Sequence, residues 1–375
     1  MKKILRTYRF ALHPNQEQRD LLARHFGCVR YVYNHFLQER IDQYRVHKQS
    51  DNYHAQARAL TLLKGQKETK WLKEVNSQSL QYALRCLETA FQNFFRGQAR
   101  FPRFKSKRHK NSFRVPQFVR LEEGRLHIPK FKTGIKVKVH RPVHGQIKHC
   151  TISRTASGKY FVGILCEEMY GPKEKTGAAC GLDLGLKDFI TSSEGKTFKN
   201  HRYTKKYAAA LKRAQQHLSR KVKGSRSFER QRRKVARLHD KIKNSRMDRL
   251  HKVSHELVSA YDLICVEDLH VKGMIKNRKL ARHISDASWA ALVRLLEYKA
   301  DWNDKKVVKV SRWYPSSKTC HKCGWLNEHL DLSMRTWTCG NGHQLERDIN
   351  AAVNILREGK RIISAGTVEP ACFLW

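Results

Sequence analysis

The chain has 375 residues, 40% of them hydrophobic, and a formal net charge of +43 that arises from 76 Lys and Arg against 33 Asp and Glu. The length predicts two or three domains with cores of their own. This net charge is much larger than solubility alone requires, so it indicates a polyanionic partner. Nucleic acid is favoured over a membrane surface because the sequence has no lipidation motif and no isolated amphipathic anchor.

The start of the chain and its cysteines indicate a reducing compartment. The charged N-terminus is not followed by the apolar core of a signal peptide, and no run approaches the roughly 18 apolar residues of a membrane span. Ten cysteines are scattered along the chain, except for three between positions 320 and 339. This distribution fits a cytoplasmic protein with one metal site better than a disulfide framework.

The N-terminal half combines a predicted β domain with a helical insertion. Residues 3–12 are typical of a strand, and His13-Pro14-Asn15 ends it and starts a helix. Apolar residues at helical spacing predict another helix over 80–94. Residues 112–166 alternate in polarity between glycines, which predicts a small antiparallel barrel that the first strand would complete. The aromatic residues of the helices are assigned to the core rather than to base stacking.

The C-terminal half predicts a second arrangement of strands and helices after a linker at 173–177. Its first part is a three-strand meander between residues 178 and 198. Charged helices, a buried strand, an amphipathic helix, another strand, the cysteine cluster and a last helix follow. Apart from the cysteine cluster, these segments are predicted at 203–258, 261–268, 286–304, 307–310 and 347–357.

Three carboxylates stand in settings that disfavour a free charge. Asp183 lies inside an apolar run, Glu267 ends one, and Asp348 opens the last predicted helix. Either strand acid alone could equally cap a strand end or pair with arginine, because a buried acid needs a partner or a metal. Together they follow the plan of ribonuclease H-like folds, so we predict that they are catalytic and bind two Mg²⁺ ions. The neighbouring Asp188 and Asp268 are assigned supporting or structural roles.

Cysteine and histidine residues crowd one segment at metal-ligand spacing. A Cys-x-x-Cys knuckle is followed, after 15 intervening residues, by a third cysteine. The second knuckle departs from the ribbon pattern because Gly342 stands where a cysteine is expected, although a Cys-x-x-x-His pair can still complete a tetrahedral zinc site. A degenerate ribbon without metal is the alternative. The predicted ligands of a structural Zn²⁺ are Cys320, Cys323, Cys339 and His343, with His321 and His329 as alternatives.

Two basic stretches are expected to contact phosphates. Between Lys205 and Lys252 the chain carries 18 Lys and Arg against three acids, an excess too large for a balanced, salt-bridged helix face. Residues 101–108 mix phenylalanine with basic side chains, which is typical of a loop that grips a nucleic-acid backbone. The residues singled out are Arg103, Lys105, Lys107 and Arg108 in the loop and Arg232 and Arg233 in the helical stretch.

The motifs together resemble those of TnpB, a family of transposon-encoded RNA-guided nucleases related to type V CRISPR effectors. The resemblance covers nearly the whole chain, and its last two segments are highly specific in combination. The segments that carry it are Leu12–Gln18, Arg30–Asn34, Ala90–Phe95, Phe101–Lys105, Gly181–Gly185, Val266–Leu269, Tyr314–Cys320 and Arg347–Ala352.

The resemblance implies an α/β multidomain fold. Its parts are an RNase H-like RuvC nuclease core with a zinc-ribbon insertion, and an N-terminal wedge β-barrel with a helical recognition insertion. The implied bounds are 1–14 and 111–172 for the barrel, 15–110 for the recognition domain, 173–313 and 346–375 for the nuclease domain and 314–345 for the zinc ribbon.

The resemblance also implies an activity and partners. The family binds a guide RNA transcribed from the transposon end, recognises a short motif beside its target and cleaves double-stranded DNA with a Mg²⁺-dependent RuvC site. Asp183, Glu267 and Asp348 match its catalytic acids. A monomer in complex with RNA, acting at the nucleoid of a prokaryotic cytoplasm, is implied. Asn and Gln suit the reading of adenine edges, and the positions that match the motif-reading region are Asn76, Ser77, Gln78 and Gln81.

Three other functions stay open from the sequence. A guided DNA-binding regulator would need the RNA but not the acids. A nonspecific nucleic-acid-binding accessory of transposition would need neither a guide nor a motif, and a conventional transposase would join DNA ends with the same fold. Because none of the three acids is missing, the sequence favours the nuclease.

Overall fold

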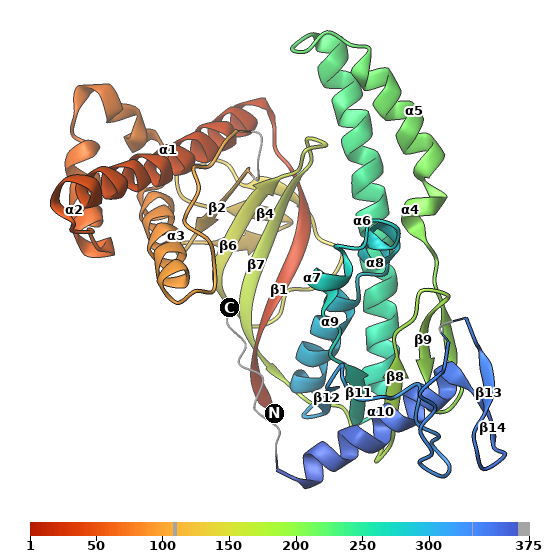
Figure 1. Ribbon diagram of the computed structural model, residues 1–375. Helices are drawn as coiled ribbons and strands as arrows, with labels where there is room; N and C mark the ends of the chain where they lie inside the picture. The colour runs from red at the N-terminus through yellow and green to blue at the C-terminus, as the bar shows by residue number, and fades with distance from the viewer. Residues whose placement is uncertain (108–110, 332, 367–375) are drawn as a thin grey trace. The chain divides into compact units, whose positions relative to one another are not determined.

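The computed structural model describes residues 1–107, 111–331 and 333–366, which divide into two compact units (Figure 1). The first unit comprises Lys3–Met169, and the second comprises the chain from Tyr170 onward together with Met1–Lys2. Each has a hydrophobic core of its own. Within the described residues, none of the helices combines the length and the hydrophobicity needed to cross a lipid bilayer.

The first unit is built on a seven-stranded sheet. Its strands are β1 (Lys2–His13), β2 (Asn111–Val115), β3 (Arg120–Glu122), β4 (Arg125–His127), β5 (Ile135–Lys138), β6 (Gln146–Arg154) and β7 (Tyr160–Tyr170). They lie in the order β2-β6-β7-β1-β5-β4-β3. The first strand of the chain is therefore central to a sheet whose other strands follow residue 110, as the sequence predicts.

A helical segment lies between β1 and β2. It consists of α1 (Gln16–His47), α2 (Tyr53–Leu63), the 3-10 helix η1 (Lys67–Glu74) and α3 (Ser77–Phe95). A capping box starts α1, because the Asn15 side chain accepts from the Gln18 backbone N–H at 2.8 Å and the Gln18 side chain accepts from the Asn15 N–H at 3.1 Å. The sequence pattern predicts α1 and α3 but neither α2 nor η1.

The second unit contains a five-stranded mixed sheet. Its strands are β8 (Ala179–Asp183), β9 (Asp188–Ser192), β10 (Thr197–Lys199), β11 (Leu263–Glu267) and β12 (Lys306–Val310). Their order is β10-β9-β8-β11-β12, with β9 antiparallel to both of its neighbours and β11 parallel to both of its own. The predicted meander and the two later strands are confirmed.

Helices cover both faces of this sheet (Figure 1). On one face α6 (Arg226–Ala260) and α9 (Trp289–Trp302) pack through leucines such as Leu257 and Leu296. On the other face α10 (Arg347–Ser364) packs directly on β8, β11 and β12, where Ile355 shares a small core with Cys265 and Val308. Neighbouring positions of β11 therefore serve different cores, with Ile264 and Val266 in the core under α6 and α9 and Cys265 in the core under α10.

Two of the predicted helices are interrupted. The charged stretch 203–258 forms α4 (Tyr203–Lys206), α5 (Ala208–Ser219) and α6, with a turn at 220–225 where Gly224 has a φ of 88°. The predicted helix 286–304 is divided because Ser288, with a φ of 58°, separates α8 (Ala281–Ala287) from α9. The short α7 (Val271–Met274) follows β11. A two-stranded sheet of β13 (Thr336–Thr338) and β14 (Gln344–Glu346) lies in the cysteine-rich segment.

Candidate functional site

Asp183 and Glu267 end neighbouring parallel strands, β8 and β11. The register of the two strands places the residues just before the acids opposite each other, so the acids follow at the same level of the sheet. Side chains of a strand alternate between faces. Gly181 and Cys265, each two residues before an acid, both face α10. Asp183 and Glu267 therefore share the face that α10 covers.

Helix α10 brings the third acid to this face. Asp348 lies in its first turn, where the positive end of the helix dipole favours a carboxylate. The close approach depends on Gly181, because a Cβ built at that position would overlap the carbonyl oxygen of Ala352 and the backbone nitrogen of Leu356. Gly181, the first glycine of the Gly-Leu-Asp-Leu-Gly motif, is thus required for the packing of α10, which the sequence alone does not reveal.

Gly181→Ala is expected to move α10 away from β8 and to lower the free energy of unfolding by about 1–3 kcal/mol, since the added methyl meets backbone atoms that cannot rotate aside. Urea unfolding measures this change. Gly163→Ala on β7 is the matched control, because its Cβ would make only an ordinary contact of 3.4 Å with Thr7. Equal stabilities of the two variants would contradict the packing argument.

The acid site disfavours its own negative charge. Burial raises the pKa of Asp183 to about 7, and the charges of Asp348 and Glu267 add to this effect, with Arg347 and Arg335 opposing it. Burial also raises the pKa of Glu267. Three acids that interact in this way gain free energy when a cation neutralises them.

Two arginines that the sequence analysis did not single out contact Asp348. A guanidinium nitrogen of Arg335, just before β13, lies 3.3 Å from the carboxylate, and a guanidinium nitrogen of the adjacent Arg347 lies 3.2 Å from it. The backbone N–H of Arg347 also donates to the Arg335 carbonyl at 2.7 Å. These contacts hold Asp348 in place and bring positive charge to the edge of the acid site. No spacing rule connects residue 335 to the acids.

The four predicted ribbon ligands come together. The ligand atoms of Cys320, Cys323, Cys339 and His343 all lie within 4.8 Å of one another, and among the described residues no other group of three or more potential ligands does so. The Cys323 and Cys339 sulfurs are 3.7 Å apart, and the Cys339 sulfur is 3.2 Å from His343 Nδ1. The Trp325 backbone N–H lowers the pKa of Cys323 and so favours its thiolate. This Cys₃His cluster is compatible with a structural zinc ion.

The alternative ligand His321 has a different role. Its backbone N–H donates to Asn350 Oδ1 at 2.9 Å, and its ring Nδ1 lies 3.0 Å from the same oxygen. Two buried asparagines of α10, Asn350 and Asn354, also donate to the Thr319 carbonyl at 2.8 and 2.6 Å. The ribbon is thereby bound to the helix that carries Asp348. The sequence contains a signal for this link in the segment Arg347–Ala352, where Asn350 follows Asp348 by two residues, but the sequence alone gives Asn350 no role.

The predicted motif-reading residues surround the start of α3. Asn76 is buried and caps the helix, with its side chain accepting from the Gln78 N–H at 3.2 Å. Ser77 accepts from Lys64 at 2.6 Å, and the Gln78 amide donates to Gln117 at 2.7 Å. Of the four residues, only Gln81 is exposed. Asn76 thus caps the helix, and its side-chain oxygen would have to keep this bond while the residue contacts a base.

The predicted phosphate-contacting loop is exposed on the first unit. Arg103, Lys105 and Lys107 are exposed there, whereas the predicted contact Arg108 lies outside the described residues. The Asn34 side chain donates to the Lys105 carbonyl at 2.9 Å and accepts from the Lys105 N–H at 2.8 Å. This reciprocal pair holds the loop against α1.

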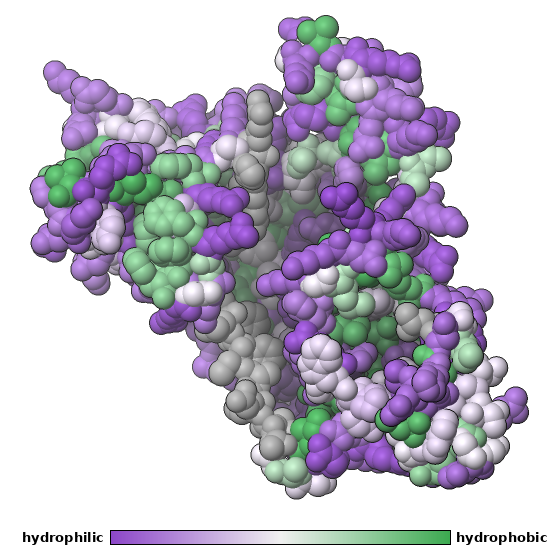
Figure 2. Space-filling model, viewed as in Figure 1, coloured by the Kyte–Doolittle hydropathy of each residue, from purple (hydrophilic) through white to green (hydrophobic). Residues whose placement is uncertain are grey.

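The basic helices form a second cationic surface. Figure 2 shows hydrophilic side chains covering much of α5 and the N-terminal half of α6. Arg233 lines a depression there with Arg226, Arg230 and other basic residues, whereas Arg232 is paired with Glu229 at 2.7 Å. The two predicted arginines therefore differ, because only Arg233 lines the depression.

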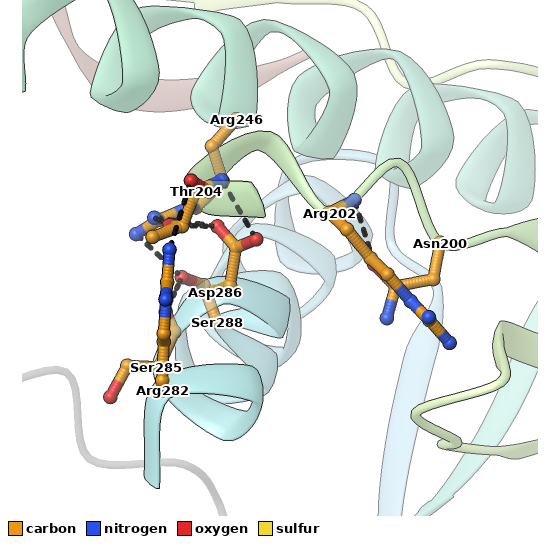
Figure 3. Close-up of polar contacts among 8 residues, drawn as sticks. All are labelled: Asn200, Arg202, Thr204, Arg246, Arg282, Ser285, Asp286 and Ser288. Atoms are coloured by element: carbon orange, nitrogen blue, oxygen red, sulfur yellow. Dashed lines mark hydrogen bonds and ion pairs between the residues drawn. The ribbon is translucent and has the colours of Figure 1, made fainter. Parts of the chain in front are cut away.

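A polar network within the second unit links α6 to α4 and α8 (Figure 3). The Asp286 carboxylate of α8 accepts from the Thr204 N–H at 3.0 Å and from the Thr204 hydroxyl at 2.7 Å. It also accepts from Arg246 of α6 at 2.8 Å, and Arg246 donates to the Ser288 hydroxyl at 3.3 Å. This partly buried network ties α4, α6 and α8 together at the base of the basic surface.

Three family profiles match the chain. They are described as "Probable transposase" over residues 151–278, "Cas12f1-like, TNB domain" over 289–355 and "Helix-turn-helix domain" over 1–49. In the last range the structure contains strand β1 and the whole of one uninterrupted 32-residue helix, α1, rather than two helices joined by a turn.

Relatives match the chain over most of its length. A protein of Streptomyces pristinaespiralis is 39% identical over 98% of this chain and 92% of the relative, and one of Escherichia coli K12 is 34% identical over 97% and 94%. Both bear the name "Putative RNA-guided DNA endonuclease", with the suffix InsQ for the second. A TnpB-like protein of Acanthamoeba polyphaga mimivirus is 30% identical over 50% of this chain and 38% of its own length.

The fold also resembles a solved structure. The protein chain of a complex named for Cas12f1, sgRNA and target DNA superimposes with a TM-score of 0.59 and 12% identity, covering 94% of this chain and 98% of that chain. This likeness establishes a Cas12f1-like fold of mixed α/β content. With relatives of 39% and 34% identity over nearly the full length, the chain belongs to the TnpB family.

Proposed function

We propose that the chain is an RNA-guided DNA endonuclease whose nuclease site consists of Asp183, Glu267 and Asp348. The observation that carries this proposal is the convergence of acids from β8, β11 and α10 on one face of a sheet. The endonuclease name of two full-length relatives supports the activity. The net charge of +43 supports a nucleic-acid substrate.

The same proposal assigns the domains. The sheet order β10-β9-β8-β11-β12, with one antiparallel strand between two others, supports an RNase H-like RuvC core over 173–313 and 346–375. Residues 314–345 would be its zinc ribbon. The seven-stranded sheet supports a wedge barrel over 1–14 and 111–172, with 15–110 as the recognition domain.

The acid site suits Mg²⁺, because its three carboxylates are oxygen ligands, and burial raises the proton affinity of Asp183 and Glu267, so that a cation is favoured there. Asp183, Glu267 and Asp348 would hold the ions. The chemistry that Mg²⁺ supplies when bound to such a set is Lewis-acid activation of the phosphodiester and the attacking water. Among the described residues, only the ligand atoms of the ribbon cluster lie within 4.8 Å of one another. The side chains of Asp183, Glu267 and Asp348 must therefore turn toward one another to share ions.

The chain's own cations would position the DNA strand. Arg335 keeps nearly half of its side chain exposed while it contacts Asp348, so its remaining N–H groups can reach a phosphate beside the acids. Arg347 is mostly buried and would orient Asp348. The ribbon, fixed to α10 through Asn350 and Asn354, would keep Arg335 at this edge.

The partners follow from the same proposal. The RNA would come from the transposon end, and its guide segment would select the target by base pairing. The start of α3 would read a short motif beside the target, with Gln81 as the exposed member of that set. The target would be double-stranded DNA, and one protein chain would act with one RNA.

The test is a plasmid-depletion experiment in cells. The protein is expressed with its flanking RNA against a plasmid library that carries the guide-matched target beside randomised bases. We expect loss of plasmids with one motif, and no loss with Asp183→Ala. Even recovery of all plasmids, although RNA is bound, would contradict cleavage, and motif-dependent repression that survives Asp183→Ala would indicate the guided regulator instead.

RNA affinity is expected to fall by at least about 10³-fold between about 50 and 200 mM salt, because many phosphate contacts release counterions. The excess of basic residues over α5 and α6 is the physical reason. Filter binding at several salt concentrations measures the slope. An affinity that stays flat across this range would contradict a phosphate-dominated interface.

A further inference from the structure

A groove on the first unit is not used by the proposed nuclease site. It lies between helix α1 and the loop after α3, and its volume of about 460 Å³ falls within the size class of ligand sites. The residues that line it are Gly27, Arg30, Tyr31, Asn34, His35, Lys105 and Lys107.

The groove is formed before any ligand binds. Asn34 exchanges two hydrogen bonds with the backbone of Lys105, at 2.8 and 2.9 Å, and so fixes the loop wall to the helix wall. The Lys105 ammonium lies 3.5 Å from the centroid of the Tyr33 ring, which sets the direction of that side chain. A ligand would therefore meet an ordered surface rather than have to create one.

The charge of the groove is uncompensated. Arg30 donates to the neutral side chain of Asn111 at 3.2 Å, and no described carboxylate forms an ion pair with Arg30, Lys105 or Lys107. Elsewhere on α1, by contrast, Arg24 and Arg40 are paired with glutamates. Three cations around one depression favour an anion with several acceptor oxygens, such as a phosphate.

An aromatic surface adjoins these cations. The Tyr31 ring is stacked on His35, with centroids 5.6 Å apart and planes 14° apart, and the Trp71 ring meets Tyr31 edge-on at 5.0 Å. Trp71 keeps 38% of its surface exposed although its indole N–H donates to the Glu68 carbonyl. Aromatic faces beside basic side chains are the combination that binds single-stranded nucleic acid.

We propose that this groove binds a phosphate and its adjoining base in a single-stranded segment of RNA. Arg30 and Lys107, with Lys105, hold the phosphate, and the base lies against the aromatic surface of Tyr31. RNA is assigned because, under the proposed function on which this inference rests, the guide RNA is a partner with single-stranded segments, whereas the target is double-stranded DNA.

The test measures binding by the full-length protein to a labelled oligouridylate and to an oligothymidylate of equal length, at several salt concentrations. In Arg30→Gln/Lys107→Gln the slope of log affinity against log salt should fall by about 0.7 for the RNA, since the one phosphate in the groove is no longer neutralised. Lys107→Gln alone should lower the slope by a smaller amount, and this variant is used if loss of the Arg30–Asn111 hydrogen bond impairs folding. Tyr31→Leu should weaken binding about tenfold without changing the slope.

Lys159→Gln is the control, because it removes an exposed lysine of the same unit outside the groove. Unchanged slopes in the groove variants would overturn the proposal, and so would an effect confined to the oligothymidylate. These outcomes are separate from the nuclease. A wild-type protein that cleaves DNA while the groove variants keep the wild-type slope rejects the groove alone. Changed slopes in a protein that never cleaves reject the nuclease alone.

Discussion

Asp183→Asn is expected to slow target cleavage by at least about 10³-fold while leaving RNA affinity within about twofold of the wild type. The amide keeps the size of the carboxylate but removes the charge that the acid site offers to cations. Single-turnover cleavage of a guide-matched plasmid measures the rate, and filter binding measures the RNA affinity. Asp268→Asn is the control, because Asp268 adjoins Glu267 in the chain but is exposed.

The same substitution should stabilise the magnesium-free protein at pH 8. Because the pKa of Asp183 rises from 3.8 to about 7 on folding, ionisation opposes folding, and stability is lost as pH rises between these values. The full shift corresponds to about 4 kcal/mol, and the partial solvent access of the side chain reduces the expected gain to about 2 kcal/mol. Urea unfolding in magnesium-free buffer checks the sign. A less stable variant, together with unimpaired cleavage, would remove Asp183 from the site.

Cys339→Ser is expected to eliminate bound zinc and to leave the ribbon, residues 314–345, open to proteolysis. A structural zinc ion supplies much of the folding free energy of so small a segment, about 10 kcal/mol or more in isolated zinc-finger peptides. Around the four ligands the small core contains little beyond Trp337 and Leu345. Elemental analysis should find about one zinc per wild-type chain and almost none in the variant. Limited proteolysis should show the opened segment.

Cleavage should fall at least about tenfold in the same variant, since Arg335 and the Thr319 carbonyl that accepts from Asn350 belong to the segment that a zinc ion would stabilise. Cys86→Ser is the control, because Cys86 lies on α3 and outside the cluster. A wild-type protein without zinc, or a Cys339→Ser protein that keeps it, would contradict the assignment of this cluster.

Periodic patterns predicted the parts of the fold that depend on local sequence. Alternation in the strands and helical spacing in α1, α3 and α6 indicated the elements, and the spacing of cysteines and His343 indicated the ribbon cluster despite Gly342. The three acids could be selected because each interrupts an apolar pattern or begins a helix. Such signals are contained within a few residues of chain.

What could not be predicted depends on contacts between distant segments. Gly181 is read as part of a motif, but its need for a missing Cβ comes from α10, which follows it by more than 160 residues. Arg335 is one arginine among many until folding places it beside Asp348. Asn350 satisfies ribbon carbonyls, a role that composition cannot distinguish from a surface amide. Ser288 divides a helix although nothing in its apolar spacing signals a break.

The central claim is tested most directly by one cleavage measurement. Purified protein loaded with its RNA is mixed, in Mg²⁺, with a supercoiled plasmid that matches the guide beside the permitted motif, and with a plasmid whose target sequence is scrambled. The account predicts linear product from the matched plasmid alone, and none from either plasmid with Asp183→Asn. Equal cutting of both plasmids, or cutting by the Asp183→Asn protein at the wild-type rate, would contradict it.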